Sequence, residues 1–324
     1  MILITGATGL VGAHLMCELI QKNDQIRAIY RNKSSIEKTR KLFQLKNLSH
    51  FWDRINWVEA DITDIQALSN AFNGVDEVYH CAAMVSFQTT DFDYMCKVNI
   101  EGTANVVNIA LANQVKKFCH ISSVATLDEI NKTTNCYDET SQWNPNNKHS
   151  DYAISKNGAE IEVWRGIQEG LPAVIVNPAV IFGDGFENQG SGLIANQIEK
   201  GMPFYTTGLM AYIGVKDLVT AMIFLMENNH FGERFVLAKE SRPIKEVFTA
   251  FANHLNKKPP YINVPKSVLH IAAVTDGILT AIIPKKERSL THDLVKTSFS
   301  KDIYDCSKYL NLSKKHFSSL EDIL

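Results

Sequence analysis

Three glycines at three-residue spacing stand directly behind an apolar run at the start of the chain. The run is Met1–Ile4, and the glycines are Gly6, Gly9 and Gly12. Beyond Gly9, apolar residues recur at intervals of three and four, which is typical of one buried helix face; they are Leu10, Val11, Leu15, Met16, Leu19 and Ile20. A glycine-rich turn between a strand and a helix is the context that a dinucleotide-binding fingerprint requires.

Each glycine has a separate physical use in such a turn. One allows the dihedral angles of a tight turn, one lets the backbone approach a pyrophosphate, and one permits close packing of helix on strand. The backbone N–H groups at the start of the helix then face the phosphates, which the helix dipole favours. We therefore expect the cofactor to contact Gly6, Thr8, Gly9, Leu10, Val11 and Gly12.

Strand-like and helix-like segments alternate through the first half of the chain. Apolar strands are expected at 25–30, 55–59, 77–83, 117–123 and 173–176, with helices between them. Such alternation predicts an α/β fold, a Rossmann-type doubly wound parallel sheet with helices on both faces. We expect residues 1–181 with 210–238 to form the NADP-binding domain, in which 210–238 returns to the sheet. Residues 182–209 with 239–324 should form a smaller, mixed substrate-binding domain.

The end of the second predicted strand indicates which dinucleotide binds. In dinucleotide folds an acidic residue about 20 positions beyond the glycines binds the ribose 2′-hydroxyl, whereas a nearby arginine accommodates a 2′-phosphate. Here Arg31 stands 19 residues after Gly12, beside Lys33 and Ser34, and no Asp or Glu occupies this place. We therefore expect NADP(H) to bind. The alternative is that NAD(H) binds and Arg31 is only a solvent-exposed surface residue.

The pattern Tyr-x-x-x-Lys places a phenol and an ammonium on one helix face, where the ammonium lowers the pKa of the phenol. It occurs three times, beginning at Tyr152, Tyr212 and Tyr304. Tyr212 lies in a predicted strand, where its lysine is too distant, and no strand carrying a hydroxyl lies next to Tyr304. Only the Tyr152 pattern, completed by Lys156, follows a strand that ends in two hydroxyls, Ser122-Ser123. Because the carboxyl ends of parallel strands face one crevice, this is the candidate catalytic pair.

These motifs stand in the order of a known enzyme family. The sequence resembles the extended short-chain dehydrogenases/reductases, of the NAD-dependent epimerase/dehydratase type, over nearly its whole length. The resemblance lies in Gly6-x-x-Gly9-x-x-Gly12, Asp61-Ile62, Ala82-Ala83, Asn99, Ser122-Ser123, Tyr152-x-x-x-Lys156 and Asn177-Pro178. Segments 79–87, 160–165 and 304–308 are similar to the branch of dihydroflavonol-reductase-like and 3β-hydroxysteroid-dehydrogenase-like enzymes. The last of these gives the Tyr304 pattern a structural role.

The resemblance implies hydride transfer between a nicotinamide cofactor and a small-molecule carbonyl or secondary alcohol. Tyr152 would pass a proton to or from the substrate oxygen, and Lys156 would bind the nicotinamide ribose and lower the pKa of the tyrosine. Ser123 would hydrogen-bond the reacting oxygen, with Ser122 as the alternative if the register is shifted by one residue. Asn99 would hold a water in the proton relay. Further cofactor contacts are implied for Asp61, Ile62, Cys81, Ala82, Ala83, Ser122, Asn177, Pro178 and Val180.

Two other functions stay open. A sugar-nucleotide epimerase would retain NAD(P) through its cycle; relatives of that kind usually prefer NAD, so Arg31 argues against it. A non-catalytic dinucleotide-sensing protein would keep the fold without turnover, and the intact Ser123, Tyr152 and Lys156 count against it. Dehydration is disfavoured because the Thr-Asp-Glu segment of sugar-nucleotide dehydratases is absent, and Leu127-Asp128-Glu129 is out of phase with it.

Composition restricts the partners and the compartment. A formal net charge of −2 with dispersed basic residues leaves no electrostatic footprint for nucleic acid. The six cysteines show no C-x-x-C spacing and the histidines form no ligand cluster, so we expect a cytoplasmic chain with reduced cysteines and no metal. The chain starts at its first strand, without a predicted signal peptide. The apolar stretch Val268–Pro284 is too short for a membrane span and should be a core helix.

The helix that carries Tyr152 also carries Trp164. Enzymes of the resembled family often pair helices at this place between subunits. We therefore expect a homodimer.

Overall fold

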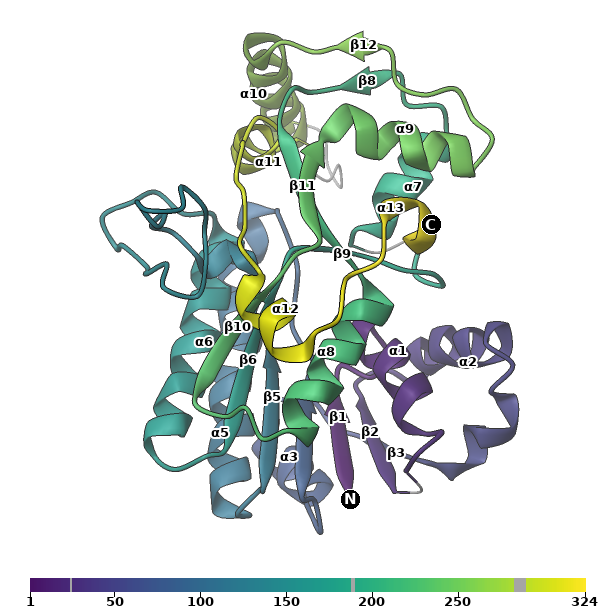
Figure 1. Ribbon diagram of the computed structural model, residues 1–324, viewed down its shortest axis with the longest axis vertical. Helices are drawn as coiled ribbons and strands as arrows, with labels where there is room; N and C mark the ends of the chain where they lie inside the picture. The colour runs from purple at the N-terminus through teal and green to yellow at the C-terminus, as the bar shows by residue number, and fades with distance from the viewer. Residues whose placement is uncertain (24, 188–189, 283–289) are drawn as a thin grey trace.

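A seven-stranded parallel sheet forms the centre of the computed structural model, which describes residues 1–23, 25–187, 190–282 and 290–324. The strand order is β10-β6-β5-β4-β1-β2-β3 (Figure 1), and each neighbouring pair is parallel. The strands are β1 (Ile2–Thr5), β2 (Ile26–Tyr30), β3 (Ile55–Glu59), β4 (Glu77–His80), β5 (Lys117–Ile121), β6 (Ala173–Pro178) and β10 (Glu233–Leu237). Their apolar runs suit a sheet covered on both faces. The α/β, Rossmann-type fold is confirmed.

Helices cover both faces of this sheet (Figure 1). Over one face lie α1, α2 and α8, which span Leu10–Leu19, Ile36–Leu45 and Val215–Glu227. Over the other lie α3, α4, α5 and α6, which span Ile65–Ala71, Phe92–Cys96, Gly102–Ala112 and Asp151–Gln168. Each face has its own apolar core, one including Leu15, Phe43 and Met222 and the other including Leu68, Val106 and Val163.

Local sequence sets where the site-bearing helices begin. The Ser150 hydroxyl accepts a hydrogen bond from Ala153 N at 3.2 Å and so caps α6. The Asp64 carboxylate caps α3 in the same way. Side-chain caps of this kind typically stabilise a helix by about 1 kcal/mol. α6 therefore starts immediately before Tyr152.

Two small sheets lie beyond the carboxyl edge of the large one. β7 (Val180–Phe182), β9 (Leu209–Gly214) and β11 (Glu240–Pro243) form a three-stranded sheet in the order β11-β9-β7. β8 (Phe204–Tyr205) pairs with β12 (Ile262–Asn263).

The segment 210–238 returns to the large sheet only in part. β10 joins it beside β6, but β9 pairs with β7 and β11 instead. The segment therefore returns to the large sheet through β10, while β9 belongs to the three-stranded sheet. Its partners are fixed by contacts with distant strands, which no local pattern reveals.

The remaining helices pack around these small sheets, except for one. They are α7 (Gly192–Glu199), α9 (Ile244–His254), α10 (Lys266–Ile282), α11 (His292–Thr297) and α13 (Leu320–Ile323). A separate apolar cluster there includes Phe182, Tyr212 and Phe251. The exception is α12 (Ser307–Ser313), which returns to the edge strand β10, where Lys308 Nζ donates to the carbonyl of Arg234 at 2.9 Å (Figure 1).

The apolar stretch Val268–Pro284 forms α10 up to Ile282, and its last two residues lie outside the described ones. It is only partly a core helix, because Val268, Ile271 and Val274 are 52%, 66% and 48% exposed while Ala273 is buried. Within the described ranges, none of the helices has the length and apolar character needed to cross a membrane.

Candidate active site

The glycine turn joins β1 to α1. Gly6 has a φ of 65°, which side chains disfavour, and a Cβ there would lie 2.6 Å from Ala82 N. At Gly12 a Cβ would collide with the carbonyl of Gly6. At Gly9 the nearest described atom to such a Cβ would be Gly6 O at 3.4 Å. The protein's own backbone therefore requires Gly6 and Gly12, whereas Gly9 borders open space.

The first turn of α1 presents uncapped backbone amides. Its N-cap is Gly9, and no described side chain caps the amides that follow. Thr8, Leu10 and Val11 are partly exposed beside it. Uncapped amides at a helix N-terminus, next to a glycine with open space, suit the pyrophosphate of a dinucleotide. The residues present therefore fit such a cofactor.

A buried polar chain ties β1 to β4 beside this turn. Thr5 Oγ1 accepts from Ala82 N at 3.1 Å and is hydrogen-bonded to His80 Nδ1 at 2.7 Å. His80 Nε2 reaches Thr103 Oγ1 at 3.0 Å. Burial lowers the pKa of His80 to about 3, so the ring is neutral. These hydrogen bonds hold the segment from Cys81 to Ala83 against the glycine turn.

Arg31 and Asp61 follow neighbouring strands, β2 and β3, and approach each other there. Arg31 Nη1 lies 3.9 Å from Asp61 Oδ2, and the arginine side chain is 55% exposed. Asp61 Oδ1 accepts from both the backbone N and the hydroxyl of Thr63, each at 2.8 Å. Ile62 is buried beneath Gly102, where an added Cβ would lie 2.6 Å from its Cδ1. Two residues predicted to contact the adenosine half are thus brought together.

The two serines after β5 point in opposite directions. The buried Ser122 hydroxyl donates to Glu160 Oε2 at 2.5 Å. Ser123 Oγ accepts from Ala125 N at 3.2 Å, and its side chain lies near enough to Tyr152 to lower the pKa of the phenol. Successive residues of an extended chain face opposite sides. The geometry therefore places Ser123 beside the tyrosine and turns Ser122 away from it.

Tyr152 and Lys156 lie four residues apart on α6. Burial raises the pKa of Tyr152 above its ordinary value, and the nearby Ser123 side chain offsets part of this rise. Lys156 is 2% exposed, and its Nζ donates to the carbonyl of Ile121 at 2.7 Å. Burial lowers the pKa of Lys156 to about 8. The ring of Phe87 lies 6.2 Å from the ring of Tyr152.

Asn99 lies in a π-helical turn, Lys97–Glu101, between α4 and α5. Its Nδ2 donates to Met84 O at 2.9 Å and to Ser155 Oγ at 3.0 Å, and its Oδ1 accepts from Met84 N at 2.7 Å. π-helical turns of this kind are frequent at functional sites. The side chain joins the segment after β4 to α6.

Asn177 stands at the end of β6 with no exposed surface. Its Nδ2 lies within hydrogen-bond distance of Ser123 O, Thr126 Oγ1 and Glu160 Oε2, at 3.2, 3.0 and 2.8 Å. Pro178 ends β6 and Val180 opens β7. These residues mark the crossing from the large sheet to the three-stranded one.

Glu160 and Arg234 were missed by sequence reasoning. Glu160 is 3% exposed, and Arg234 Nη1 donates to its Oε1 at 3.1 Å. One signal was available for Glu160, because it stands four residues after Lys156 and so shares the helix face of Tyr152. No sequence pattern indicated Arg234, which lies on β10.

The other two Tyr-x-x-x-Lys patterns have different surroundings. The Tyr212 hydroxyl, on β9, donates to Glu240 Oε1 at 2.6 Å. Tyr304 stacks on Tyr137 with ring centroids 5.4 Å apart, and its lysine, Lys308, pairs with Glu233 at 2.8 Å. Both tyrosines therefore make structural contacts: Tyr212 joins the strands β9 and β11, and Tyr304 packs the C-terminal segment on Tyr137.

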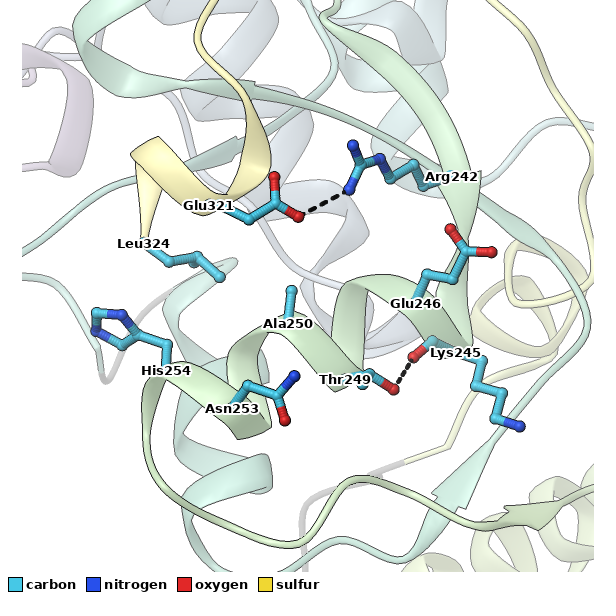
Figure 2. A pocket seen from close by; sticks show the side chains of 9 residues that line it. All are labelled: Arg242, Lys245, Glu246, Thr249, Ala250, Asn253, His254, Glu321 and Leu324. Carbon is cyan, nitrogen blue, oxygen red and sulfur yellow. Dashed lines mark hydrogen bonds and ion pairs between the residues drawn. The ribbon is translucent and has the colours of Figure 1, made fainter.

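An open groove of about 720 Å³ lies away from these residues, between α9, β11 and α13. Figure 2 shows Arg242 reaching toward Glu321 across it, at 3.1 Å, while Asn253 and His254 line its far end. None of the predicted site residues lines this groove. It therefore adds nothing to the catalytic geometry.

Comparison with known proteins agrees with this arrangement. The model of the family described as "NAD dependent epimerase/dehydratase family" matches residues 2–238. The chain belongs to this family. The matched range includes the glycine turn, both serines, the Tyr152 helix and β10.

The epimerase/dehydratase relatives include plant and bacterial reductases. Cinnamoyl-CoA reductase 1 of Petunia hybrida is 28% identical over 73% of this chain and 72% of the relative. A putative dihydroflavonol 4-reductase of Synechocystis is 27% identical over 94% of this chain and 87% of the relative. The crystal structure of gox2253 has a TM-score of 0.80 at 26% identity and covers 99% of this chain and 94% of its own. The family and these relatives support an NAD(P)-dependent oxidoreductase or epimerase.

Proposed function

We propose that the protein is an NADP(H)-dependent oxidoreductase that interconverts a carbonyl compound and its secondary alcohol. The observation that carries the proposal is the nearness of the Ser123 side chain to the Tyr152 phenol, whose pKa it lowers, with Lys156 one turn further along α6. The glycine turn follows β1 and Ser123 follows β5, so both lie at the carboxyl edge of one parallel sheet. In such folds that edge is where cofactor and substrate meet.

Each residue has one task in this proposal. In the reducing direction Tyr152 donates its proton to the substrate oxygen, and Ser123 hydrogen-bonds the same oxygen. The bound nicotinamide supplies the hydride in that direction and accepts it in the other. The Lys156 ammonium holds the nicotinamide ribose and favours the tyrosine's anionic form. Asn99 holds a relay water, with the second Oδ1 lone pair or its backbone carbonyl as acceptor, since both Nδ2 hydrogens are used.

The proposed preference for NADP(H) rests on Arg31. Its exposed guanidinium stands beyond β2 beside Asp61, and bidentate arginine contacts suit a phosphate. The remaining proposed cofactor contacts come from the amides of the glycine turn and from residues at the ends of β3, β4 and β6. NAD(H) stays the alternative cofactor.

The proposed substrate is a small carbonyl compound. Val85 and Phe87, in the segment after β4, are 55% and 52% exposed, and Phe87 lies against Tyr152. Exposed apolar side chains beside the reacting tyrosine favour an apolar or aromatic group on the substrate. The small sheets and helices of 182–209 and 239–324 are proposed as the substrate-binding domain.

The test is a panel of carbonyls with NADPH, followed by absorbance of the reduced cofactor. A dihydroflavonol, whose ketone is reduced to a secondary alcohol, represents the proposed reaction. Cinnamoyl-CoA, a thioester whose reduction gives an aldehyde and free CoA, represents the other named relative, and UDP-glucose represents an epimerase substrate. We expect one equivalent of NADPH to be oxidised for each carbonyl reduced. Epimerisation of UDP-glucose without net cofactor oxidation would instead establish the second candidate, which the family description favours.

We also propose a homodimer in the cytoplasm. Ile154 and Ile161, on α6, are 37% and 55% exposed, and Tyr94 on the neighbouring α4 is 51% exposed. An apolar patch on a helix pair is the kind of surface that a second copy covers.

A further inference from the structure

The buried carboxylate of Glu160 is surrounded by five hydrogen-bonding side chains. Its Oε2 accepts from the hydroxyls of Ser122 and Thr126 and from Asn177 Nδ2, at 2.5, 2.9 and 2.8 Å. Its Oε1 accepts from Trp164 Nε1 and Arg234 Nη1, at 3.2 and 3.1 Å. Three of these partners, Asn177 Nδ2, Trp164 Nε1 and Arg234 Nη1, can only donate, and the last of them carries a positive charge. The arrangement therefore suits the ionised form.

This carboxylate holds the turn that carries Ser123. Thr126 Oγ1 and Asn177 Nδ2 lie 3.0 and 3.2 Å from Ser123 O. Asn177 Nδ2 also donates to Glu160 Oε2, and the single hydroxyl hydrogen of Thr126 is shared between this carboxylate and the Ser123 carbonyl. The serine turn and the end of β6 are thus fastened to α6 at one point, four residues beyond Lys156.

Glu160 and Lys156 are both buried and stand four residues apart on α6, so they share one helix face. Its negative charge raises the pKa of Lys156 against the burial that lowers it to about 8. The other titratable neighbours are held neutral by burial, which raises the pKa of the Cys81 thiol and lowers the pKa values of His80 and His120. A buried ammonium needs an opposite charge nearby. Among these neighbours, only Glu160 supplies it.

We propose that Glu160 is a positioning residue of this site, which holds the Ser123 turn in place and keeps the Lys156 ammonium charged in its buried position. The effect of Glu160 on catalytic turnover rests on the proposed oxidoreductase function. The effect of Glu160 on the Lys156 ammonium is independent of that function and can be measured without substrate. Arg234, on β10, balances the negative charge of the same carboxylate, and its own side chain is 15% exposed.

The test follows the Lys156 amine by NMR in protein with isotope-labelled lysine, with Lys156→Met to assign the signal. An amine that titrates near pH 8 stands apart from ordinary lysines near 10.5. We expect Glu160→Gln to lower the midpoint by about one pH unit or more. Glu160→Asp, which keeps the charge, should stay closer to the unaltered protein than Glu160→Gln does. Trp164→Phe removes one hydrogen bond and no charge, so its midpoint should not move.

An unchanged midpoint in Glu160→Gln overturns the proposal. If that variant does not fold, the unaltered protein decides the matter. The carboxyl signal of Glu160 in protein with labelled glutamate should then show an inflection at the Lys156 midpoint, and Lys156→Met should abolish it. Absence of the inflection likewise overturns the proposal. If the NMR results agree but no carbonyl in the panel is reduced, the proposed function fails and the inference about Glu160 stands.

Discussion

Arg31 Nη1 lies 3.9 Å from Asp61 Oδ2, beyond the carboxyl ends of the adjacent strands β2 and β3. The contact is long and the arginine is exposed, so it contributes little to stability. We propose that its consequence lies in cofactor binding, because Arg31 is held beside Asp61 while 55% of its side chain stays exposed.

Replacing Arg31 by Asp should reverse the cofactor preference. We expect the affinity for NADPH to fall by about 10-fold or more, since a charge-assisted contact is lost and a like charge is gained. The affinity for NADH should change much less. Fluorescence titration with both cofactors measures this, with the exposed Lys257→Asp as a control for net charge. Equal losses for the two cofactors would mean that the 2′-phosphate is bound elsewhere.

Two glycine substitutions should separate folding from cofactor binding. In Gly12→Ala the new Cβ meets the backbone of Gly6 and Ala7, so we expect a loss of about 1–3 kcal/mol in the free energy of unfolding. In Gly9→Ala the Cβ meets only Gly6 O at 3.4 Å, so stability should change little. Both variants should bind NADPH poorly. Urea unfolding and cofactor titration test this, and a Gly12→Ala protein of normal stability would contradict it.

Stability should rise with pH between about 8 and 10.5 because of Lys156. Burial lowers the amine's pKa from 10.5 to about 8, so in this window the unfolded chain binds a proton that the folded chain has released. The free energy of unfolding should therefore increase by up to roughly 3 kcal/mol across the window. Lys156→Met should lack this increment. Urea unfolding at both ends of the window compares the two proteins, and identical pH dependence would refute the prediction.

The proposed dimer can be disrupted on α6. Ile161→Lys places a charge in the patch formed with Ile154 and Tyr94, so sedimentation should give a monomer where the unaltered protein gives a dimer. The exposed Ile271→Lys on α10 is the matched control and should remain dimeric. If the unaltered protein sediments as a monomer at all concentrations, the proposed dimer is contradicted.

The parts of the fold that follow from short-range pattern could be predicted from the sequence. The glycine turn and α6 are encoded by nearby residues: spacing, a capping Ser150 and apolar periodicity. The partners of β9 could not be predicted, because they depend on strands far away in sequence.

Within the site, the sequence could not show which of two adjacent serines faces the tyrosine. The sequence shows two adjacent serines, and only the backbone after β5 decides that Ser123 reaches Tyr152 while Ser122 reaches Glu160. Glu160 bonds residues up to 74 positions away from it in sequence, the most distant being Arg234 on β10, and no spacing pattern links them. The π-helical turn at Asn99 likewise has no local signature that distinguishes it from ordinary helix.

The most direct test of the proposed function is the turnover of Tyr152→Phe with NADPH and the carbonyl that the unaltered protein reduces. The ring and its packing against Phe87 are kept while the proton donor is removed. We expect NADPH affinity close to normal and turnover lower by about 10²–10⁴-fold, whereas Tyr304→Phe, in the third Tyr-x-x-x-Lys pattern, should turn over normally. Unchanged turnover in Tyr152→Phe would contradict the assignment of this tyrosine as the proton donor, and with it the proposed mechanism.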